Sequence, residues 1–345
     1  MKKLLPKLAL ALVPVLAYVC IFVAFDAYNY FGLQATTNTN NPVMRVKGFT
    51  QNPTDYIILG DSRLAHFDSE IIREVNGHAY TNLAFGGASL EESLDLFDYA
   101  YKTNPNLKGV VFGLSFYTLN KSYGSVSRMS TIKTQLQNPV AYISNLEYNV
   151  NMLTNLQNKL TGAPDDTEAE ETRTPLPDDY TAADGTQLPY RKDLILYATN
   201  LYTNCAVPGT LPKVQTAADG SAANVPQLLA AMQSTTATAS KWALNEKQLQ
   251  RLLDTVALCK QKGIAFAVVL PPMDESVRTL VCDALGITPV MQRTVQQLQA
   301  AGVTVYDYEW QPLLALTDAS FYDGFHLDTR SGLALFTRSL FEAVN

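Results

Sequence analysis

Short apolar runs that alternate with helical patterns are the feature that most constrains the fold of this chain. Between these runs, apolar residues recur at helical spacing, as in Leu90–Tyr101 and Asn245–Lys262. Strands that are apolar throughout and alternate with helices form parallel sheets covered on both faces. The sequence therefore predicts an α/β protein, a doubly wound three-layer α/β/α sandwich of the flavodoxin-like kind. Its five expected strands are Tyr56–Leu59, Ala79–Phe85, Gly109–Leu114, Ile264–Leu270 and Val303–Tyr306.

Two further helices are expected after the fourth strand. The first covers Pro289–Ala301 and ends at Gly302, because glycine commonly follows the last helical residue. The second covers Thr329–Ala343, with Asp328 as its N-cap, since an aspartate side chain accepts hydrogen bonds from the first free N–H groups of a helix.

The middle of the chain, at about 125–241, does not alternate between strands and helices. Asn145–Leu160 and Lys192–Thr203 have helical patterns, and the segment Gly162–Gly185 is rich in Asp, Glu, Thr and Pro. That composition buries too little apolar surface to order itself, so we expect a mobile loop there. We interpret the whole region as an insertion between the third and fourth strands. It is either a cap or partner surface, or a tolerated surface excursion.

An uncharged run of 18 residues, Leu8–Phe25, follows three lysines at the N-terminus and precedes Asp26. This length is at the lower limit for crossing a bilayer, and the lysines favour a cytoplasmic N-terminus. We therefore predict a membrane anchor at 1–27, a juxtamembrane linker at 28–50 and an extracytoplasmic domain at 51–345. A cleaved signal peptide is the alternative, but the sequence lacks a clear small-x-small cleavage site.

Composition excludes some classes of function. The net charge of −6 argues against nucleic-acid binding, which needs a basic surface to neutralise phosphates. Three cysteines lie outside the apolar N-terminal run: Cys205, Cys259 and Cys282. Either Cys259 pairs with Cys282, or all three are buried thiols. The chain has no Cys-x-x-Cys motif and its three histidines are scattered, so no structural zinc site is expected. The serine chemistry described below implies no metal or organic cofactor.

Residues with chemical potential follow the predicted strands. Open α/β sheets bind ligands at the carboxyl ends of their strands. Gly60-Asp61-Ser62-Arg63 follows the first strand, Gly86-Gly87 the second and Ser115 the third. Asp323 and His326 lie between the fifth strand and the last helix. The topology therefore predicts that these groups meet at one edge of the sheet.

Together these residues suit acyl transfer through a serine. A serine hydroxyl becomes a good nucleophile when a base takes its proton. His326 suits that role because histidine titrates near neutral pH, and Asp323 can hold its tautomer and stabilise the imidazolium. The N–H groups of Ser62 and Gly87 are expected to bind the oxyanion of the tetrahedral intermediate.

Three blocks of this pattern resemble the SGNH, or GDSL-like, hydrolase superfamily. "ILGDSR" resembles the first block, which carries the nucleophile Ser62. "TNLAFGGAS" resembles the second, with Asn82 and the oxyanion residue Gly87. "YDGFHLD" resembles the last, with Asp323 and His326. The resemblance implies an SGNH-like catalytic domain over 51–345 with a Ser-His-Asp triad.

The third block departs from the family pattern. The family supplies an asparagine side chain there, whereas this chain has Gly113–Tyr117, so Ser115 is the expected substitute as an oxyanion donor. Subfamilies without this asparagine include membrane-anchored D-alanine transfer proteins and polysaccharide O-acetyltransferases. This resemblance implies an esterase or O-acyltransferase that acts on a cell-envelope polysaccharide or teichoic-acid-like acceptor, with a membrane-bound acyltransferase as a further partner. Arg63 is the candidate for binding an anionic substrate group.

Two other functions stay open at the sequence level. A degenerate SGNH domain could bind or scaffold an envelope assembly machine without catalysis, with Ser62 acting only as a helix cap. A soluble secreted lipase is the third alternative. Whether His326 lies within hydrogen-bond reach of Ser62 distinguishes catalysis from scaffolding.

Overall fold

The computed structural model describes residues 4–33, 41–123, 127–162, 179–311 and 313–344. They divide into two compact units. One unit comprises Met1–Asn52 and Arg128–Glu171, and the other comprises Pro53–Ser127 and Thr172–Asn345. The second unit contains the predicted sheet and every residue singled out for chemistry.

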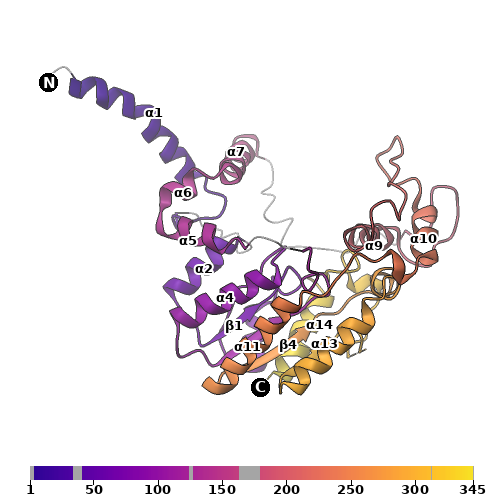
Figure 1. Ribbon diagram of the computed structural model, residues 1–345. Helices are drawn as coiled ribbons and strands as arrows, with labels where there is room; N and C mark the ends of the chain where they lie inside the picture. Colours follow the sequence, from indigo (N-terminus) through magenta and orange to yellow (C-terminus); the bar gives the residue numbers. More distant parts are fainter. Residues whose placement is uncertain (1–3, 34–40, 124–126, 163–178, 312, 345) are drawn as a thin grey trace. The chain divides into compact units, whose positions relative to one another are not determined.

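The second unit is built on a five-stranded parallel sheet with the order β2-β1-β3-β4-β5. Figure 1 labels two of its strands, β1 and β4. This order is the flavodoxin-like one, and it confirms the predicted α/β fold with five parallel strands. The second strand is shorter than predicted, because the Asn82 side chain accepts a hydrogen bond from Ala84 N and turns the chain. The strands are β1 (Tyr56–Leu59), β2 (Tyr80–Asn82), β3 (Gly109–Gly113), β4 (Ala265–Leu270) and β5 (Thr304–Asp307).

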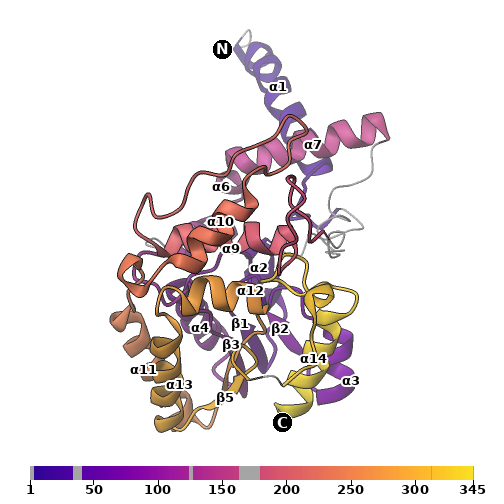
Figure 2. The same cartoon turned by 90° about the vertical axis from the view of Figure 1, so that its right-hand side faces the viewer.

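Helices cover both faces of this sheet. Two of them pack together on one face, and three lie over the other face (Figure 2). On the first face are α3 (Ser69–Asn76) and α14 (Gly332–Ala343). On the second are α4 (Leu90–Thr103), α11 (Glu246–Lys262) and α13 (Thr288–Ala300). The sequence prediction of helices on both faces of a parallel sheet is therefore confirmed.

The core follows from the alternation of side chains along each strand. Ile58, Val111 and Val269 face α14 and pack with its residues Phe336 and Leu340. On the opposite face the rings of Phe112 and Phe266 stack with their centroids 5.7 Å apart, and Phe97 of α4 lies 6.4 Å from Phe266. Because the central strands are buried on both faces, they read as continuous apolar runs in the sequence.

Two glycines bring the turn after β1 close to the end of β3. Gly60 has a φ of +146°, and a Cβ built on it would lie 3.2 Å from the Cα of Gly113. A Cβ on Gly113 would lie 2.7 Å from a methyl carbon of Leu64. This close approach places Ser62 directly above the end of the central strand pair.

The predicted insertion does not behave as one excursion. Residues 128–162 belong to the first unit, whereas residues from 179 onward pack into the second. There Arg191 is fully buried and donates to the backbone oxygens of Asp318 and Phe321. These bonds connect the start of α9 (Lys192–Cys205) to the segment that precedes Asp323. Most of the expected mobile loop, residues 163–178, lies outside the described residues.

The remaining elements of the second unit lie in the returning part of the insertion and in the connections around β4 and β5. They are α9 (Lys192–Cys205), α10 (Val225–Ser234), η1 (Ala237–Ala239), α12 (Glu275–Val277), η2 (Arg278–Asp283) and η3 (Asp318–Ser320). Among these, α9 contacts α10, α12 and η2. The contacts make α9 an integral part of the unit that carries the sheet.

The first unit is helical and is organised around a buried carboxylate. Asp26 accepts hydrogen bonds from the Tyr142 hydroxyl at 2.7 Å and from the N–H groups of Tyr28 and Tyr30. Tyr30 and Tyr142 stack with centroids 4.1 Å apart. The elements are α1 (Leu4–Ala24), α2 (Pro42–Gln51), α5 (Met129–Gln137), α6 (Pro139–Ile143) and α7 (Leu146–Thr161). The segment predicted as a linker, 28–50, thus contains buried residues and most of α2.

The apolar N-terminal run forms α1. Over the part of the chain that the structure describes, no helix combines the length and the apolar character that crossing a membrane requires. The predicted transmembrane helix is therefore not confirmed, and the anchor stays a prediction.

The structure differs from two local predictions, the pairing of Cys259 with Cys282 and the N-cap of the last helix. All four cysteines of the chain are among the described residues and carry free thiols, so Cys259 and Cys282 do not pair. The N-cap of α14 is Ser331, not Asp328. Asp328 still serves that end of the helix, because its carboxylate accepts from the N–H groups of Arg330, Ser331 and Gly332 in the tight turn ahead of α14.

Candidate active site

The structure brings Ser62, His326 and Asp323 together at the carboxyl edge of the sheet. The Ser62 hydroxyl lies 2.7 Å from Nε2 of His326, and Nδ1 of His326 lies 2.8 Å from Oδ2 of Asp323. The side chains of His326 and Asp323 are only 13% and 15% exposed. With the Nδ1 proton directed at the carboxylate, Nε2 is the acceptor for the serine hydroxyl, and this is the tautomer that both contacts favour.

Asp323 is held by the turn that carries His326. Its Oδ1 accepts from the N–H groups of Phe325 at 3.0 Å and His326 at 2.7 Å. Burial by itself raises the pKa of Asp323, but the hydrogen bonds and charge of His326, together with the N–H of Phe325, outweigh burial and hold the pKa below its ordinary value. The carboxylate therefore stays ionised and can stabilise an imidazolium.

Asp61 holds the turn that presents Ser62. It is 1% exposed; its Oδ1 accepts from Arg63 N at 2.9 Å and its Oδ2 from the Ser115 hydroxyl at 2.6 Å. The prediction of Ser115 as an oxyanion donor is wrong. Ser115 is fully buried and its hydroxyl proton is committed to Asp61. The residue after β3 therefore supports the serine turn from below instead of facing a substrate.

The prediction that Arg63 binds substrate is also wrong. Its side chain turns into the interior, where its guanidinium donates to Ser115 Oγ at 3.2 Å and to the backbone oxygens of Pro271 and Pro272. It also lies 4.2 Å from the centre of the Phe325 ring. The reason is that the ends of several strands meet here and leave carbonyl oxygens that need a donor. Arg63 thus links the serine turn to the histidine turn through Phe325.

The guanidinium of Arg63 also contacts Glu309, which the sequence analysis did not single out. Glu309 Oε2 lies 3.3 Å from the Arg63 guanidinium, and both side chains are at most 1% exposed. Burial raises the pKa of Glu309 to about 8, although Arg63 opposes this shift. Its position just after β5, at the same edge as the other groups, is the signal that could have identified it.

The turn after β2 packs against the serine turn. Asn82 donates to the backbone oxygens of Leu64 at 2.8 Å and Ala65 at 3.3 Å, and Phe85 N donates to Gly60 O. Gly87 lies in this turn, is exposed and has a φ of +67°, a conformation that favours glycine. The residue predicted as an oxyanion donor is therefore on the turn that contacts the loop around Ser62.

Aromatic side chains surround the histidine. The Phe325 ring lies 5.5 Å from the ring of Tyr117, and the Tyr197 ring of α9 lies 5.8 Å from the His326 ring. Tyr197 was not predicted, because nothing in the local sequence of α9 indicates that it reaches the last turn of the chain. These rings reduce access of water to the imidazole.

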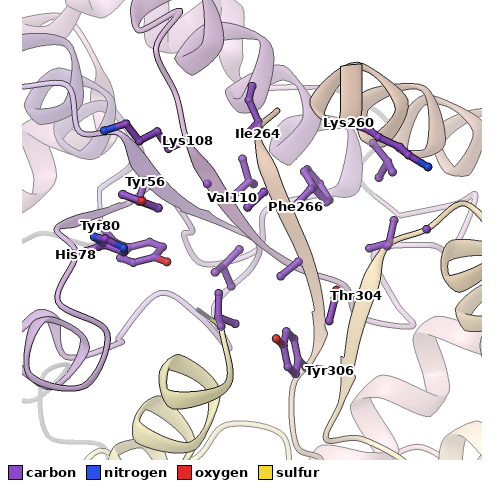
Figure 3. Close-up of a pocket in the computed structure, with 18 residues that line it drawn as sticks. Tyr56, His78, Tyr80, Lys108, Val110, Lys260, Ile264, Phe266, Thr304 and Tyr306 are labelled. Atoms are coloured by element: carbon purple, nitrogen blue, oxygen red, sulfur yellow. The ribbon is translucent and has the colours of Figure 1, made fainter. Parts of the chain in front are cut away.

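A separate cavity of about 400 Å³ lies at the opposite, amino end of the strands (Figure 3). Tyr56, Tyr80 and Tyr306 line it, and the ring of His78 stacks on Tyr56 with centroids 4.2 Å apart. His78 precedes β2 and lies at the edge of the sheet that does not carry Ser62. This cavity therefore takes no part in the candidate site.

Comparison with known proteins does not assign a family. No protein-family model matches the chain, and no curated protein matches its sequence. Among solved structures, the chain is similar to a candidate acylhydrolase from Bacteroides fragilis, with 12% identity and a TM-score of 0.36. That match covers 86% of this chain and 88% of the other. So distant a likeness carries no argument about function.

Proposed function

We propose that this protein is a serine-dependent acyl-ester hydrolase or O-acyltransferase, in which Ser62, His326 and Asp323 form the catalytic triad. The observation that carries the proposal is the continuous chain of contacts from the serine hydroxyl through the imidazole to the carboxylate, at 2.7 Å and 2.8 Å. Nucleophile and base within hydrogen-bond reach, with the base oriented by a third group, is the arrangement that activates a serine. A non-catalytic scaffold has no need of this alignment.

We infer the following reaction. Ser62 Oγ attacks the ester carbonyl carbon while Nε2 of His326 takes the hydroxyl proton. The N–H groups of Ser62 and Gly87 hold the negative oxygen of the tetrahedral intermediate. His326 then returns the proton to the departing alcohol, which leaves an acyl group on Ser62. Water or a sugar hydroxyl, deprotonated by the same imidazole, attacks the acyl-enzyme and regenerates the serine.

The proposed substrate is an O-acylated carbohydrate of the cell envelope, with the catalytic domain outside the membrane. The support is the uncharged run Leu8–Phe25 behind three lysines, together with the resemblance to membrane-anchored acyl-transfer proteins. A membrane-bound acyltransferase is the proposed partner that supplies acyl groups. Fractionation of expressing cells tests the location: the full chain is expected to resist alkaline carbonate extraction, and release into the soluble fraction would contradict the anchor.

Reaction with a fluorophosphonate probe tests the catalytic serine without knowledge of the acceptor. The purified full chain is treated with the probe and the modified residue is identified by peptide mass. We expect one adduct, on Ser62, which is absent in Ser62→Ala and strongly slowed in His326→Ala, while circular dichroism shows both variants folded. A folded wild-type protein that forms no adduct on Ser62 would contradict the proposal.

A further inference from the structure

A second cavity in the same unit is assigned no role by the triad. It has a volume of about 410 Å³. Its eight lining residues come from the segment after β3, from α9 and from the connection that leads to α11. They are Tyr117, Asn120, Ser122, Tyr123, Leu201, Asn204, Cys205 and Lys241.

This cavity lies beside the catalytic residues. Tyr117, in its wall, lies 5.5 Å from Phe325, the neighbour of His326. The Tyr123 hydroxyl lies 3.7 Å from where a Cβ on Gly87 would stand. The cavity therefore adjoins both the histidine turn and the expected oxyanion turn.

Helix α9 joins the cavity to the triad. Tyr197 contacts His326, and Leu201 follows it by four residues on the same face of the helix. At 1.5 Å per residue, Leu201 lies about 6 Å and Asn204 about 10 Å along the helix axis from Tyr197. The cavity therefore lies within about two helical turns, along α9, of the residue that contacts His326.

The walls combine aromatic rings with amide and hydroxyl groups. The rings of Tyr117 and Tyr123 pack edge to face with centroids 4.8 Å apart, and both residues are partly exposed. Asn120 Oδ1 accepts from the N–H and the hydroxyl of Ser122, which fixes the shape of this wall. Aromatic faces that cover apolar ring hydrogens, beside a few polar groups that fix orientation, suit a sugar ring.

The charge of the lining side chains indicates whether a bound sugar would be neutral, cationic or anionic. Among the eight described lining residues, Lys241 is the single charged side chain, and none is a carboxylate. Burial raises the pKa of the Cys205 thiol to about 12, so this wall adds no negative charge at neutral pH. Among the lining residues, an acidic group on the ligand would meet one cation and no carboxylate, while Asp61 interacts with Tyr117 of this wall.

We propose that this cavity, hereafter the Lys241 subsite, binds an anionic sugar ring of the carbohydrate whose ester reacts at Ser62. The ligand class is an acidic saccharide bearing a carboxylate or a phosphate, with its ring against Tyr117 and Tyr123 and its charge at Lys241. The location of the ligand relative to Ser62 rests on the proposed function, whereas its binding in the cavity does not.

Calorimetric titration of the full chain with trigalacturonic acid, and with its neutral methyl ester, tests the subsite directly. The two probes have the same rings and differ in charge. We expect the acid to bind and the ester to bind about fivefold more weakly, the worth of an exposed ion pair. Lys241→Gln is expected to remove this difference, whereas Lys247→Gln, an exposed lysine outside the cavity, retains it.

Variants on α9 test the place of binding. Asn204→Trp enlarges an exposed side chain at the cavity and is expected to abolish binding of the acid, as is Leu201→Trp. Thr203→Trp, exposed on the same helix but outside the lining, is the matched control and should bind as wild type does. Absence of binding by wild type, or equal binding by Asn204→Trp and Thr203→Trp, overturns the subsite.

The fluorophosphonate reaction separates this proposal from the catalytic one. For each variant, the rate of labelling with trigalacturonic acid is divided by the rate without it. A ratio well below one in wild type and in Thr203→Trp, but near one in Asn204→Trp, is expected. Cavity-dependent binding in a protein whose Ser62 never reacts would preserve the subsite and refute the proposed function. Labelling of Ser62 without any saccharide binding would do the reverse.

Discussion

At the scale of single residues, the site is a largely buried triad that lies on a layer of buried polar side chains. Asp61, Ser115, Arg63 and Glu309 are joined in one network beneath Ser62. Leaving a buried polar group without its hydrogen-bond partner is expensive, so each member constrains the others. The network's contact with Phe325 carries that constraint to the turn of His326.

The first residue-scale prediction concerns Asp323→Asn. Asparagine keeps an acceptor for the N–H groups of Phe325 and His326, but its amide presents a donor to Nδ1 and favours the wrong tautomer. We expect fluorophosphonate labelling of Ser62 to slow by about 10⁴-fold with the fold intact. Asp254→Asn, an exposed aspartate on α11, is the control. A labelling rate within about tenfold of wild type would show that Asp323 does not orient the imidazole.

The second concerns the pH dependence of stability through Glu309. Its folded-state pKa of about 8 exceeds the ordinary value of 4.5, so between these pH values the folded protein holds a proton that the unfolded chain releases. Wild type should therefore lose stability as pH rises through this window, by at most about 1.4 kcal/mol per pH unit. The Glu309→Gln side chain does not titrate. In urea unfolding at pH 5, 6, 7 and 8, the free energy of unfolding of the variant should therefore rise relative to that of wild type as the pH increases. A difference that is constant with pH would contradict the assignment.

At the scale of elements, the site depends on how closely the turns after the strands can approach one another. The turns after β1 and β2 are tied by Asn82, and the last turn is held against the N-terminus of α14 by Asp328. Burial alone raises the pKa of Asp328, but the hydrogen bonds it accepts from Gly332, Ser331 and Arg330 outweigh burial and lower it. The triad thus lies between three turns that are each hydrogen-bonded in place.

The element-scale prediction is that Gly113→Ala destabilises the fold. The new methyl group would lie 2.7 and 2.8 Å from the two terminal carbons of Leu64, which is itself fully buried. Overpacking of this kind costs about 1–3 kcal/mol. Gly86→Ala is the matched control, because nothing lies within 4 Å of its Cβ position. Urea unfolding should separate the two variants, and equal stability would show that the turn after β1 can move away from β3.

At the scale of the whole molecule, the chain order and the spatial order differ. The N-terminal residues 1–52 form a unit with residues 128–171, although these two segments are separated in the sequence by the segment that carries the first three strands. Asp26, expected as the flank of a membrane segment, is 2% exposed and joins α1 to α6 through Tyr142. Truncations intended to remove the apolar N-terminus should therefore retain Asp26.

The whole-molecule prediction is that Tyr142→Phe loosens the first unit. Removing the hydroxyl takes one hydrogen-bond donor from the buried Asp26 carboxylate, at a cost of about 1–3 kcal/mol. Hydrogen exchange in α6 and α7 should accelerate. Tyr18→Phe, which loses exposed hydrogen bonds to Ile143 and Asn149, should change exchange much less. Equal protection in both variants would mean that Asp26 does not organise this unit.

The sequence alone was sufficient to predict the five strands, their parallel direction, and the proximity of Ser62 to Asp323 and His326. These features depend on local apolar periodicity and on the rule that parallel strands end at one edge, so short windows contain the information. The tertiary structure decided what the neighbours of these residues do. Arg63 and Ser115 are polar residues close to the serine turn. Their local sequence is equally compatible with a side chain that faces a substrate and with one that is buried. The folded chain places Glu309, Pro271 and Pro272, which follow distant strands, beside the Arg63 guanidinium. Burial of this cation is favourable only because these residues accept its hydrogen bonds.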